Sequence, residues 1–506
     1  MSVFEKGMAG LPVLSSLCND VKKARSPVML TGVGHIHKAL LAHALCSRLQ
    51  RKAVFLVADE AEGVRLCEDL NALGEAALFL PSRELSLRQV DASSREYEQQ
   101  RLAVLSRMLK NDYSVVVACA DAVFSYTVPP QVLQKRTLSL VAGKDVPVEN
   151  LPAALSAAGY ERCDQIEGAG QFAVRGGIID VYPAQNAAPL RIELWGDTVD
   201  TISQFDLISQ RRTETLEKAD IPPACEISYD SASELAAKIE ELANSISGKR
   251  APTVREALLA DVDRLRGGAG LSAPHKYLPL IYPEAQTVLA YAPEALLFVS
   301  ETTKVRERIR AVEWQLEENI QALLEENLIC KELCHYQADW EDVLRVWEQY
   351  STVLMETFSR SVGDVPLKEV YSLTCRQLPV WSGGVSLLCE DLQDALGRRE
   401  ACVVLAGAEE KNAKLLAEDL QKQGIPALYA PSPEKPIAGQ VLVLTGGLSA
   451  GAQFPEAGLT IITHGRMNKV QKRRRLNRQA GLQIHSLSEL SVGDYVVHAA
   501  HGIGVY

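Results

Sequence analysis

Four short, almost entirely apolar segments alternate with helical patterns between Val28 and Ala120. The apolar segments read VMLTGV, AVFLVA, ALFLP and SVVVACA. The segments between them, such as Lys38–Leu49 and Arg95–Leu109, carry apolar residues at helical spacing. Strands that are apolar on both faces and joined by helices are typical of a parallel sheet covered on both sides. The sequence therefore predicts an α/β domain at the start of the chain.

The composition limits the classes of function. A chain of 506 residues suggests several domains, and 47% hydrophobic residues are enough to form their cores. The net charge of −11 makes the chain as a whole a poor binder of polyanions. No apolar run reaches the roughly 18 residues that a membrane span needs. Eleven scattered cysteines are typical of reduced thiols. We therefore expect a cytoplasmic multidomain protein without a membrane partner.

The pattern changes after about Val141. Residues around Gly170–Val181 and Leu190–Asp206 alternate between polar and apolar, and prolines interrupt them. This alternation is typical of half-buried strands. It predicts a small mixed or antiparallel β domain inserted into the first domain.

Further along, the buried-strand pattern returns. We expect short strands at Thr287–Tyr291 and Leu296–Val299, followed by a helical region from Thr302 to Phe358. A second alternation of strands and helices runs from Val403 to Thr463. It predicts a compact α/β domain of its own.

A basic stretch follows, from His464 to Gly481. It contains no acidic residue and includes Lys472, Arg473, Arg474 and Arg475. A solvated linker is the usual explanation of such a run, and contact with a DNA phosphate backbone is the alternative. A β-rich pattern then begins, and the sequence stops within an expected strand.

The first expected strand is followed by a degenerate phosphate-binding loop. In the pattern GxxxxGK[ST], the second Gly lets backbone N–H groups surround a phosphate, the Lys binds the terminal phosphates, and the hydroxyl holds Mg²⁺. The segment from Gly32 to Ala39 is GVGHIHKA. Lys38 is therefore in place, but His37 replaces the Gly and Ala39 replaces the hydroxyl residue.

A second part of the nucleotide site is altered far along the chain. The expected strand LLFVSE has Ser300 before Glu301, where a metal-holding Asp normally stands. Nucleotide-binding and metal-binding residues are thus missing at two places far apart in the sequence. This indicates that the fold is retained but that the chain does not hydrolyse ATP. We therefore predict no catalytic residue and no cofactor for this chain.

Two groups of possible metal ligands are His35 with His37, and Cys330 with Cys334 and His335. Neither group has a second half at ligand spacing. We predict no metal site.

The segment GQFAVRGGIIDVYPAQNAAPLRIELWGDTVDTISQFDLISQRRTE (Gly170–Glu214) resembles a block shared by the bacterial excinuclease protein UvrB and the transcription-repair coupling factor family. Leu448–Thr463, the basic stretch and Ser491–Tyr506 resemble the coupling factors as well. In UvrB, a tyrosine-rich hairpin clamps damaged DNA. The counterpart here, Pro81–Arg101, is short and has Tyr97 as its only aromatic residue. The resemblance is therefore to the N-terminal part of the coupling factors, over essentially the whole chain.

The resemblance implies an α/β multidomain architecture. The implied parts are a degenerate RecA-like parallel-sheet domain with a P-loop remnant (1–136), an inserted domain of small mixed β structure that binds the excinuclease protein UvrA (137–222), the remainder of the first module with a strand and a helical region (223–370), a small α/β domain (371–465), a basic linker (466–486), and the truncated start of an RNA polymerase-interacting domain (487–506). Only the first strand of an SH3-like β barrel is expected in the last part.

The resemblance also implies a function in transcription-coupled nucleotide excision repair. Coupling factors recognise RNA polymerase stalled at a DNA lesion, displace it with an ATP-driven DNA translocase, and recruit UvrA. The contacts to UvrA map onto Arg175, Arg191 and Trp195, where the family usually has Phe at the third position. ATP and Mg²⁺ belong to a motor that this chain lacks. The other implied partners are the β subunit of RNA polymerase, and DNA, mainly through the motor.

The residues alone leave alternatives open. Arg175 could merely support the Arg-Gly turn, and Trp195 could belong to the core. Arg191 and Trp195 are four residues apart on one strand, and this spacing places them on the same face. An ATP-dependent helicase resembling UvrB and a non-catalytic DNA-binding scaffold are the competing functions. We rank the adaptor function, recruitment of UvrA, first. The helicase ranks last, because the nucleotide loop lacks the glycine and the hydroxyl residue that bind phosphate and Mg²⁺.

Overall fold

The computed structural model describes residues 2–83, 85–88, 95–148, 150–268, 270–382, 384–431 and 435–464, and the backbone of 495–498 and 502–505. The chain divides into two compact units, Met1–Arg466 and Met467–Tyr506. Within the described residues, no helix is both long and apolar enough to cross a membrane.

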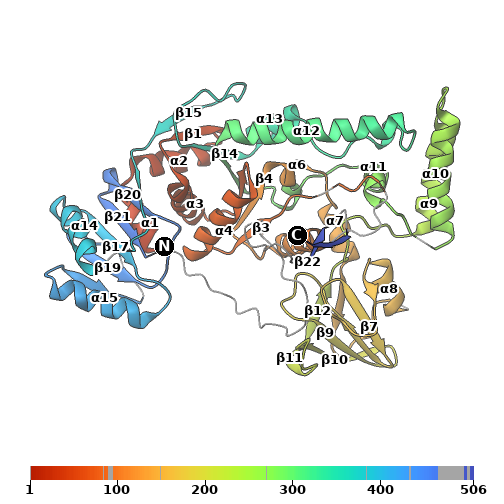
Figure 1. Ribbon diagram of the computed structural model, residues 1–506, viewed down its shortest axis with the longest axis horizontal. Coiled ribbons are helices and arrows are strands. Elements are labelled where there is room, and N and C mark those ends of the chain that lie inside the picture. Colours follow the sequence, from red (N-terminus) through yellow and green to blue (C-terminus); the bar gives the residue numbers. More distant parts are fainter. Residues whose placement is uncertain are drawn as a thin grey trace. The chain divides into compact units, whose positions relative to one another are not determined.

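The largest sheet has seven parallel strands in the order β15-β1-β14-β13-β2-β4-β3 (Figure 1). Its strands are β1 (Val28–Thr31), β2 (Ala53–Val57), β3 (Ala77–Leu80), β4 (Val115–Cys119), β13 (Leu296–Ser300), β14 (Ser351–Glu356) and β15 (Glu369–Ser372). The strands β1, β2, β4 and β13 are buried along their whole length, which explains their continuous apolar patterns. The predicted parallel α/β sheet is confirmed.

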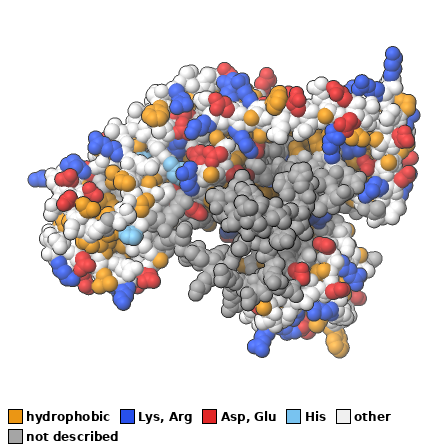
Figure 2. All heavy atoms as spheres, viewed as in Figure 1, with side chains coloured by type: hydrophobic (Ala, Val, Ile, Leu, Met, Phe, Trp, Pro, Cys, Tyr) orange, Lys and Arg blue, Asp and Glu red, His pale blue; other side chains and the backbone are white. Residues whose placement is uncertain are grey.

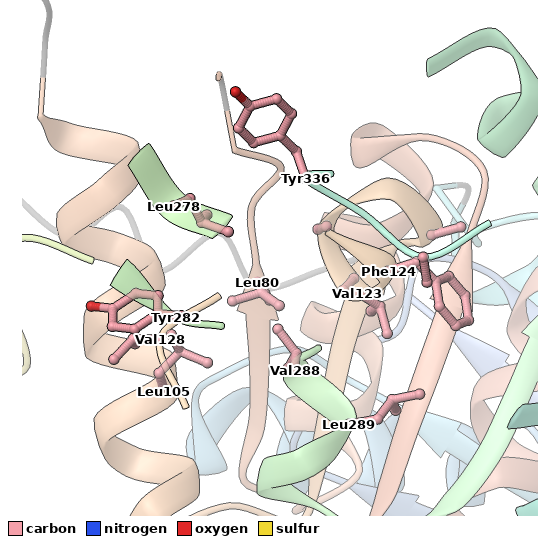
Figure 3. Close-up of a cluster of buried hydrophobic side chains, with 14 of the residues drawn as sticks. Leu80, Leu105, Val123, Phe124, Val128, Leu278, Tyr282, Val288, Leu289 and Tyr336 are labelled. Atoms are coloured by element: carbon pink, nitrogen blue, oxygen red, sulfur yellow. The ribbon is translucent and has the colours of Figure 1, made fainter. Parts of the chain in front are cut away.

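Helices on the two faces of this sheet enclose two separate cores. One core contains residues of α1 (Val3–Gly7), α2 (Pro12–Lys22), α3 (His35–Leu49) and α4 (Glu60–Ala72). The other contains residues of α5 (Glu96–Leu109), α6 (Ala120–Phe124), α12 (Thr302–Glu325) and α13 (Trp340–Gln349). Figure 3 shows part of the second core, where Leu80 of β3 lies near Leu105 of α5 and Val288.

Two expectations about this domain are wrong. Thr287–Tyr291, expected as a strand, contains the short 3-10 helix η3 (Val288–Tyr291). The region from Thr302 to Phe358, expected to be helical, contains the buried strand β14 after α12 and α13. A short apolar run fits a buried strand and a buried helix equally well. The segment Ser351–Glu356 forms a strand because its backbone pairs with β1 and β13.

A smaller β unit lies between β4 and β13 in the sequence. Its six-stranded sheet has the order β11-β10-β9-β8-β7-β6, and only β6 and β7 pair in parallel. The strands are β6 (Glu161–Arg162), β7 (Gln171–Arg175), β8 (Ile178–Val181), β9 (Leu190–Trp195), β10 (Thr198–Phe205) and β11 (Arg212–Leu216). A two-stranded sheet of β5 (Leu138–Val141) and β12 (Lys218–Ile221), together with α8 (Leu151–Ala157), completes the unit. The strands expected in this segment are present.

Several helices lie around these two sheets. They are α7 (Pro130–Arg136), α9 (Ala232–Ser245), α10 (Ala251–Arg266), α11 (Leu278–Ile281), and the 3-10 turns η1 (Met8–Gly10), η2 (Pro274–Tyr277) and η4 (Lys331–Leu333). The helices α9 and α10 pack along each other (Figure 1). Ile239 and Leu258 are among their fully buried residues.

The second α/β alternation forms a six-stranded sheet in the order β16-β20-β21-β17-β19-β18. Its strands are β16 (Arg376–Leu378), β17 (Ala401–Leu405), β18 (Ala427–Tyr429), β19 (Val441–Leu444), β20 (Gly451–Phe454) and β21 (Leu459–Thr463), and η5 (Pro455–Ala457) joins the last two. Helices α14 (Val385–Gly397) and α15 (Glu410–Lys422) cover one face. Residues of the other face belong to the same core as α1, α2 and α3.

In the unit Met467–Tyr506, the described backbone forms a hairpin of β22 (Tyr495–His498) and β23 (Gly502–Val505). The expectation of a single strand is corrected by this second strand. The basic residues Lys472, Arg473, Arg474 and Arg475 lie outside the described residues. The exact domain boundaries and the RecA-like and SH3-like assignments stay predictions.

Candidate functional site

Strand β9 carries two of the three residues predicted to bind a partner. Leu190 and Ile192 point into the core of the β unit, while Arg191 and Trp195 lie on the opposite face. This follows from the two-residue period of a strand. Trp195 is 85% exposed, so the alternative that it belongs to the core is wrong.

The third residue, Arg175, lies at the end of β7 near the same end of the sheet. The Arg175–Gly177 turn connects β7 to β8, and the Leu194 N–H donates to the Gly177 carbonyl at 2.7 Å. A Cβ on Gly177 would lie 2.9 Å from the Leu194 carbonyl oxygen, so the close approach requires glycine there. The main-chain bond brings the Arg-Gly turn beside the strand end that carries Trp195.

One buried carboxylate holds both arginines. Asp180 of β8 is 1% exposed, and its register partner on β9 is Arg191. Arg191 donates from Nε and Nη2 to the two carboxylate oxygens at 2.8 and 2.9 Å, and Arg175 donates from Nη2 at 2.7 Å. The hydrogen bonds from Arg191 to Asp180 raise the pKa of the guanidinium. Arg191 is thus fixed in direction while Arg175 stays half exposed.

Two further residues support Arg191. Its Nη1 donates to the Gln210 carbonyl at 3.2 Å, and its Nη2 donates to Gln210 Oε1 at the same distance. The guanidinium lies 4.4 Å from the centre of the Phe205 ring, a cation–π contact. Sequence reasoning assigns no role to Asp180, Phe205 or Gln210. The signal that could have found them is their membership of the Gly170–Glu214 block.

On the side of the β unit that Figure 2 shows, charged side chains of both signs lie among exposed apolar side chains. Arg212 of β11 pairs with Glu193 of β9, which also accepts a hydrogen bond from Thr201 at 2.9 Å. The neighbouring Arg211 is exposed. We call the sheet face that carries Arg175, Arg191, Glu193, Trp195 and Arg212 the arginine–tryptophan surface; Trp195, Arg175 and Arg212 are its most exposed members.

The degenerate nucleotide loop is covered by the chain itself. Gly32 has a φ of +85°, and a Cβ there would lie 2.1 Å from the Leu373 carbonyl oxygen. The Leu373 N–H donates to the Thr31 carbonyl at 3.0 Å, and the Cys375 thiol donates to the Gly32 carbonyl at 2.8 Å. The segment 373–377 therefore packs directly on the loop.

Lys38 is engaged inside the protein. Its ammonium donates to Glu301 Oε1 at 2.6 Å and to Ser300 Oγ at 2.9 Å, and the side chain is 3% exposed. Burial works to raise the pKa of the Glu301 carboxyl, but hydrogen bonds from Lys38 and Thr357 outweigh it and hold the pKa below its ordinary value. Ala39 is fully buried in the core. The structure thus brings Lys38, Ser300 and Glu301, which the sequence analysis assigns to one degenerate nucleotide site, into direct contact through an internal ion pair.

His37 packs on the second α/β sheet. Its imidazole lies edge-on to Phe454 at 5.1 Å, and Nε2–H donates to the Arg376 carbonyl at 3.1 Å. Burial lowers the pKa of His37 to about 4, against the raising effect of the Arg376 hydrogen bond.

A pH dependence of stability follows from His37. The unfolded chain binds a proton here below pH 6.5, while the folded protein binds it only near pH 4, so the free energy of unfolding falls as the pH decreases through this window. We expect the contribution to reach about 2 kcal/mol at pH 5. Denaturant unfolding of His37→Gln from pH 7 to 5 should show a flatter profile than that of the unsubstituted protein. The exposed His335 gives a matched control in His335→Gln; an unchanged slope for His37→Gln contradicts the prediction.

The other candidate ligands do not converge. His35 lies 3.3 Å from Asp69, and Cys334 donates to the Cys330 carbonyl at 3.4 Å. Among the described residues, no group of three or more His, Cys, Asp or Glu side chains could hold a metal ion.

Known proteins resemble this chain both in one segment and over most of its length. Residues 138–226 match the family described as the UvrB interaction domain. The chain is 29% identical over 97% of its length to the transcription-repair-coupling factor of Bacillus subtilis (strain 168), of which it covers 43%. It is 24% identical over 95% of its length to that of Staphylococcus haemolyticus (strain JCSC1435), covering 42%, and 23% identical over 84% to that of Staphylococcus aureus (strain USA300), covering 37%.

The chain spans less than half the length of these curated relatives. The comparisons confirm the resemblance to the N-terminal part of the transcription-repair coupling factors, on which the expected role in DNA repair rests.

Proposed function

Given its resemblance to the N-terminal part of the transcription-repair coupling factors, we propose that this chain recruits the excinuclease protein UvrA to DNA lesions where RNA polymerase has stalled. The contact is the arginine–tryptophan surface of the β unit at residues 138–226. In this role the chain is an adaptor in transcription-coupled nucleotide excision repair. The stalled RNA polymerase and the damaged DNA are the further partners in the complex to which this chain would bring UvrA.

The observation that carries the proposal is an 85% exposed Trp195 on the same strand face as Arg191, which a buried carboxylate holds together with Arg175. Trp and Arg lead the residue types that dominate binding energy at protein interfaces. Asp180 and Gln210 already fix the Arg191 side chain, so binding loses little side-chain entropy there. Such a group has the properties of a binding hot spot.

We further propose that this chain does not hydrolyse ATP and needs no cofactor. A phosphate-binding Lys must be free to meet the terminal phosphates, whereas Lys38 pairs with Glu301. The segment 373–377 lies on the loop where phosphates would bind. These contacts argue against the helicase alternative. The DNA-scaffold alternative depends on Lys472–Arg475, which lie outside the described residues.

Removing the indole tests the adaptor proposal. We expect the purified chain to bind purified UvrA, and Trp195→Ala to weaken binding at least about tenfold, as truncation of a hot-spot aromatic does. Isothermal titration calorimetry gives both affinities. Trp314 of α12 is also exposed, at 65%, and Trp314→Ala is the matched control that should bind normally. Absence of binding by the unsubstituted chain would overturn the adaptor function, and equal losses for both variants would remove its assignment to this surface.

A further inference from the structure

We propose that the loop from Asp206 to Arg211, between β10 and β11, is a second contact element for the partner, with Ile208 as its apolar anchor. The inference rests on the proposed function, because it assigns the loop to the same partner as the arginine–tryptophan surface. The loop belongs to the Gly170–Glu214 block, but the three residues predicted to bind UvrA, Arg175, Arg191 and Trp195, all lie outside it.

Hydrogen bonds within the loop hold its backbone in one form. Asp206 Oδ1 accepts from the N–H of Ser209 at 2.8 Å and from its hydroxyl at 2.9 Å. The Gln210 N–H donates to the Asp206 carbonyl at 2.8 Å, and the Asp206 N–H donates to the Arg211 carbonyl at 3.0 Å. A loop closed in this way presents its side chains in fixed directions, which lowers the entropy lost on binding.

Gln210 ties this loop to Arg191. Its φ is +57°, a left-handed conformation in which glycine would be less strained. The side chain that occupies this position donates from Nε2 to the Leu207 carbonyl at 2.8 Å and accepts from Arg191 through Oε1. A glycine would remove both side-chain bonds. The strained residue therefore connects the loop to the arginine–tryptophan surface.

The two apolar residues of the loop point in different directions. Leu207 packs against the small cluster of Ile166, Ala173 and Phe205, on the sheet face that carries Arg191. Ile208 is 59% exposed. A single exposed apolar side chain is common on protein surfaces. Here the side chain stands on a hydrogen-bonded loop that contacts Arg191. The register of β9 and β10 places this loop at the Leu190 end of β9, the end opposite to Trp195, so Ile208 extends the arginine–tryptophan surface along the strand beyond Arg191.

The charges indicate the chemistry of the partner. Arg175 and Arg191 share the carboxylate of Asp180, Arg212 pairs with Glu193, and Arg211 is exposed. These four arginines outnumber the three carboxylates of the surface and the loop, Asp180, Glu193 and Asp206, so the charge balance is positive. The complementary surface on UvrA carries carboxylates around apolar recesses that take Trp195 and Ile208.

The experiment is titration of purified UvrA with the full chain and with Ile208→Ser. We expect a loss of affinity of about tenfold, typical of a buried aliphatic anchor, and recovery to within about twofold in Ile208→Leu, which restores a similar apolar area. Ile437 of the second α/β domain is 58% exposed, which makes Ile437→Ser the matched control with unchanged affinity. Thermal unfolding of each variant checks that the fold is intact.

The outcomes separate the two proposals. Normal binding by Ile208→Ser, with binding still lost in Trp195→Ala, overturns the contact role of the loop and leaves the adaptor function in place. Failure of the unsubstituted chain to bind overturns both. A loss in Ile208→Ser that Ile208→Leu does not recover also counts against an apolar anchor. The contact role of the loop is supported if Ile208→Ser loses affinity for UvrA, Ile208→Leu recovers it, and Ile437→Ser binds normally.

Discussion

Replacing Arg191 with alanine is expected to weaken binding to UvrA by at least about 100-fold. In the proposed contact this guanidinium meets carboxylates of the partner, and loss of one member of a buried charge pair across an interface costs about 2 to 5 kcal/mol. The same variant should lower the free energy of unfolding by about 3 kcal/mol. Asp180 is 1% exposed and would keep only Arg175 as a charged partner. Calorimetric titration and denaturant unfolding measure the two effects.

A second variant separates binding from folding. In Asp180→Asn/Arg191→Ala, the uncompensated buried charge is removed, so much of the lost stability should return. Binding should stay weak, because the guanidinium that meets the partner is still absent. Binding within about threefold of normal in Arg191→Ala would contradict the central place given to this side chain. Recovery of binding in the double variant would show that Arg191 acts only by supporting the fold.

Replacing Lys38 with methionine is expected to destabilise the protein by about 3 to 5 kcal/mol, since it leaves the buried Glu301 carboxylate without its cation. A lysine that served only to bind phosphate would leave no such deficit when replaced. Differential scanning calorimetry should show the loss, and the double variant Lys38→Met/Glu301→Gln should recover most of it. The pKa of Glu301 is held low by Lys38 and Thr357, so the pair stabilises the fold above the ordinary carboxyl pKa and loses this effect at lower pH. The double variant should lack that acid-dependent part.

Magnesium ATP is the control for this experiment. A ligand present at 100 times its dissociation constant stabilises the folded state by about 2.7 kcal/mol. We expect millimolar magnesium ATP to leave the unfolding temperature of the unsubstituted chain unchanged. A rise that is lost in Lys38→Met would contradict the proposal that the loop binds no nucleotide. An unchanged stability in Lys38→Met would contradict the role of the ion pair in the fold.

The sequence is sufficient for the elements whose patterns are unambiguous. The runs at Val28, Ala53 and Val115 are almost entirely apolar and form interior strands of the parallel sheet. Ser351–Glu356 directly follows the helical pattern of α13, and local pattern therefore places it in a helical region. Its conformation depends on pairing with β1 and β13, and β1 lies more than 300 residues earlier in the sequence. Local pattern cannot supply such pairing.

The same limit applies to the site. Strand alternation places Arg191 and Trp195 on one face, and the exposure of Trp195 agrees with it. The role of Asp180 depends on the β8–β9 register, which sets it opposite Arg191. The ion pair of Lys38 with Glu301 likewise joins residues from distant parts of the sequence. The sequence indicates which residues belong to a candidate site, whereas the side chains that they contact become known only from the fold.

The shared core has a consequence for how the protein can be divided. Leu405, Phe454 and Ile461 of the second α/β domain pack in one cluster with residues of α1, α2 and α3. A fragment that ends between these two domains would expose this apolar surface to water and invite aggregation. The β unit at 138–226 has a core of its own, built from residues such as Phe172, Ile192 and Leu140. A minimal stable fragment is therefore the inserted β unit itself, which begins and ends at the paired strands β5 and β12. A fragment that ends between the two α/β domains is the poorer choice.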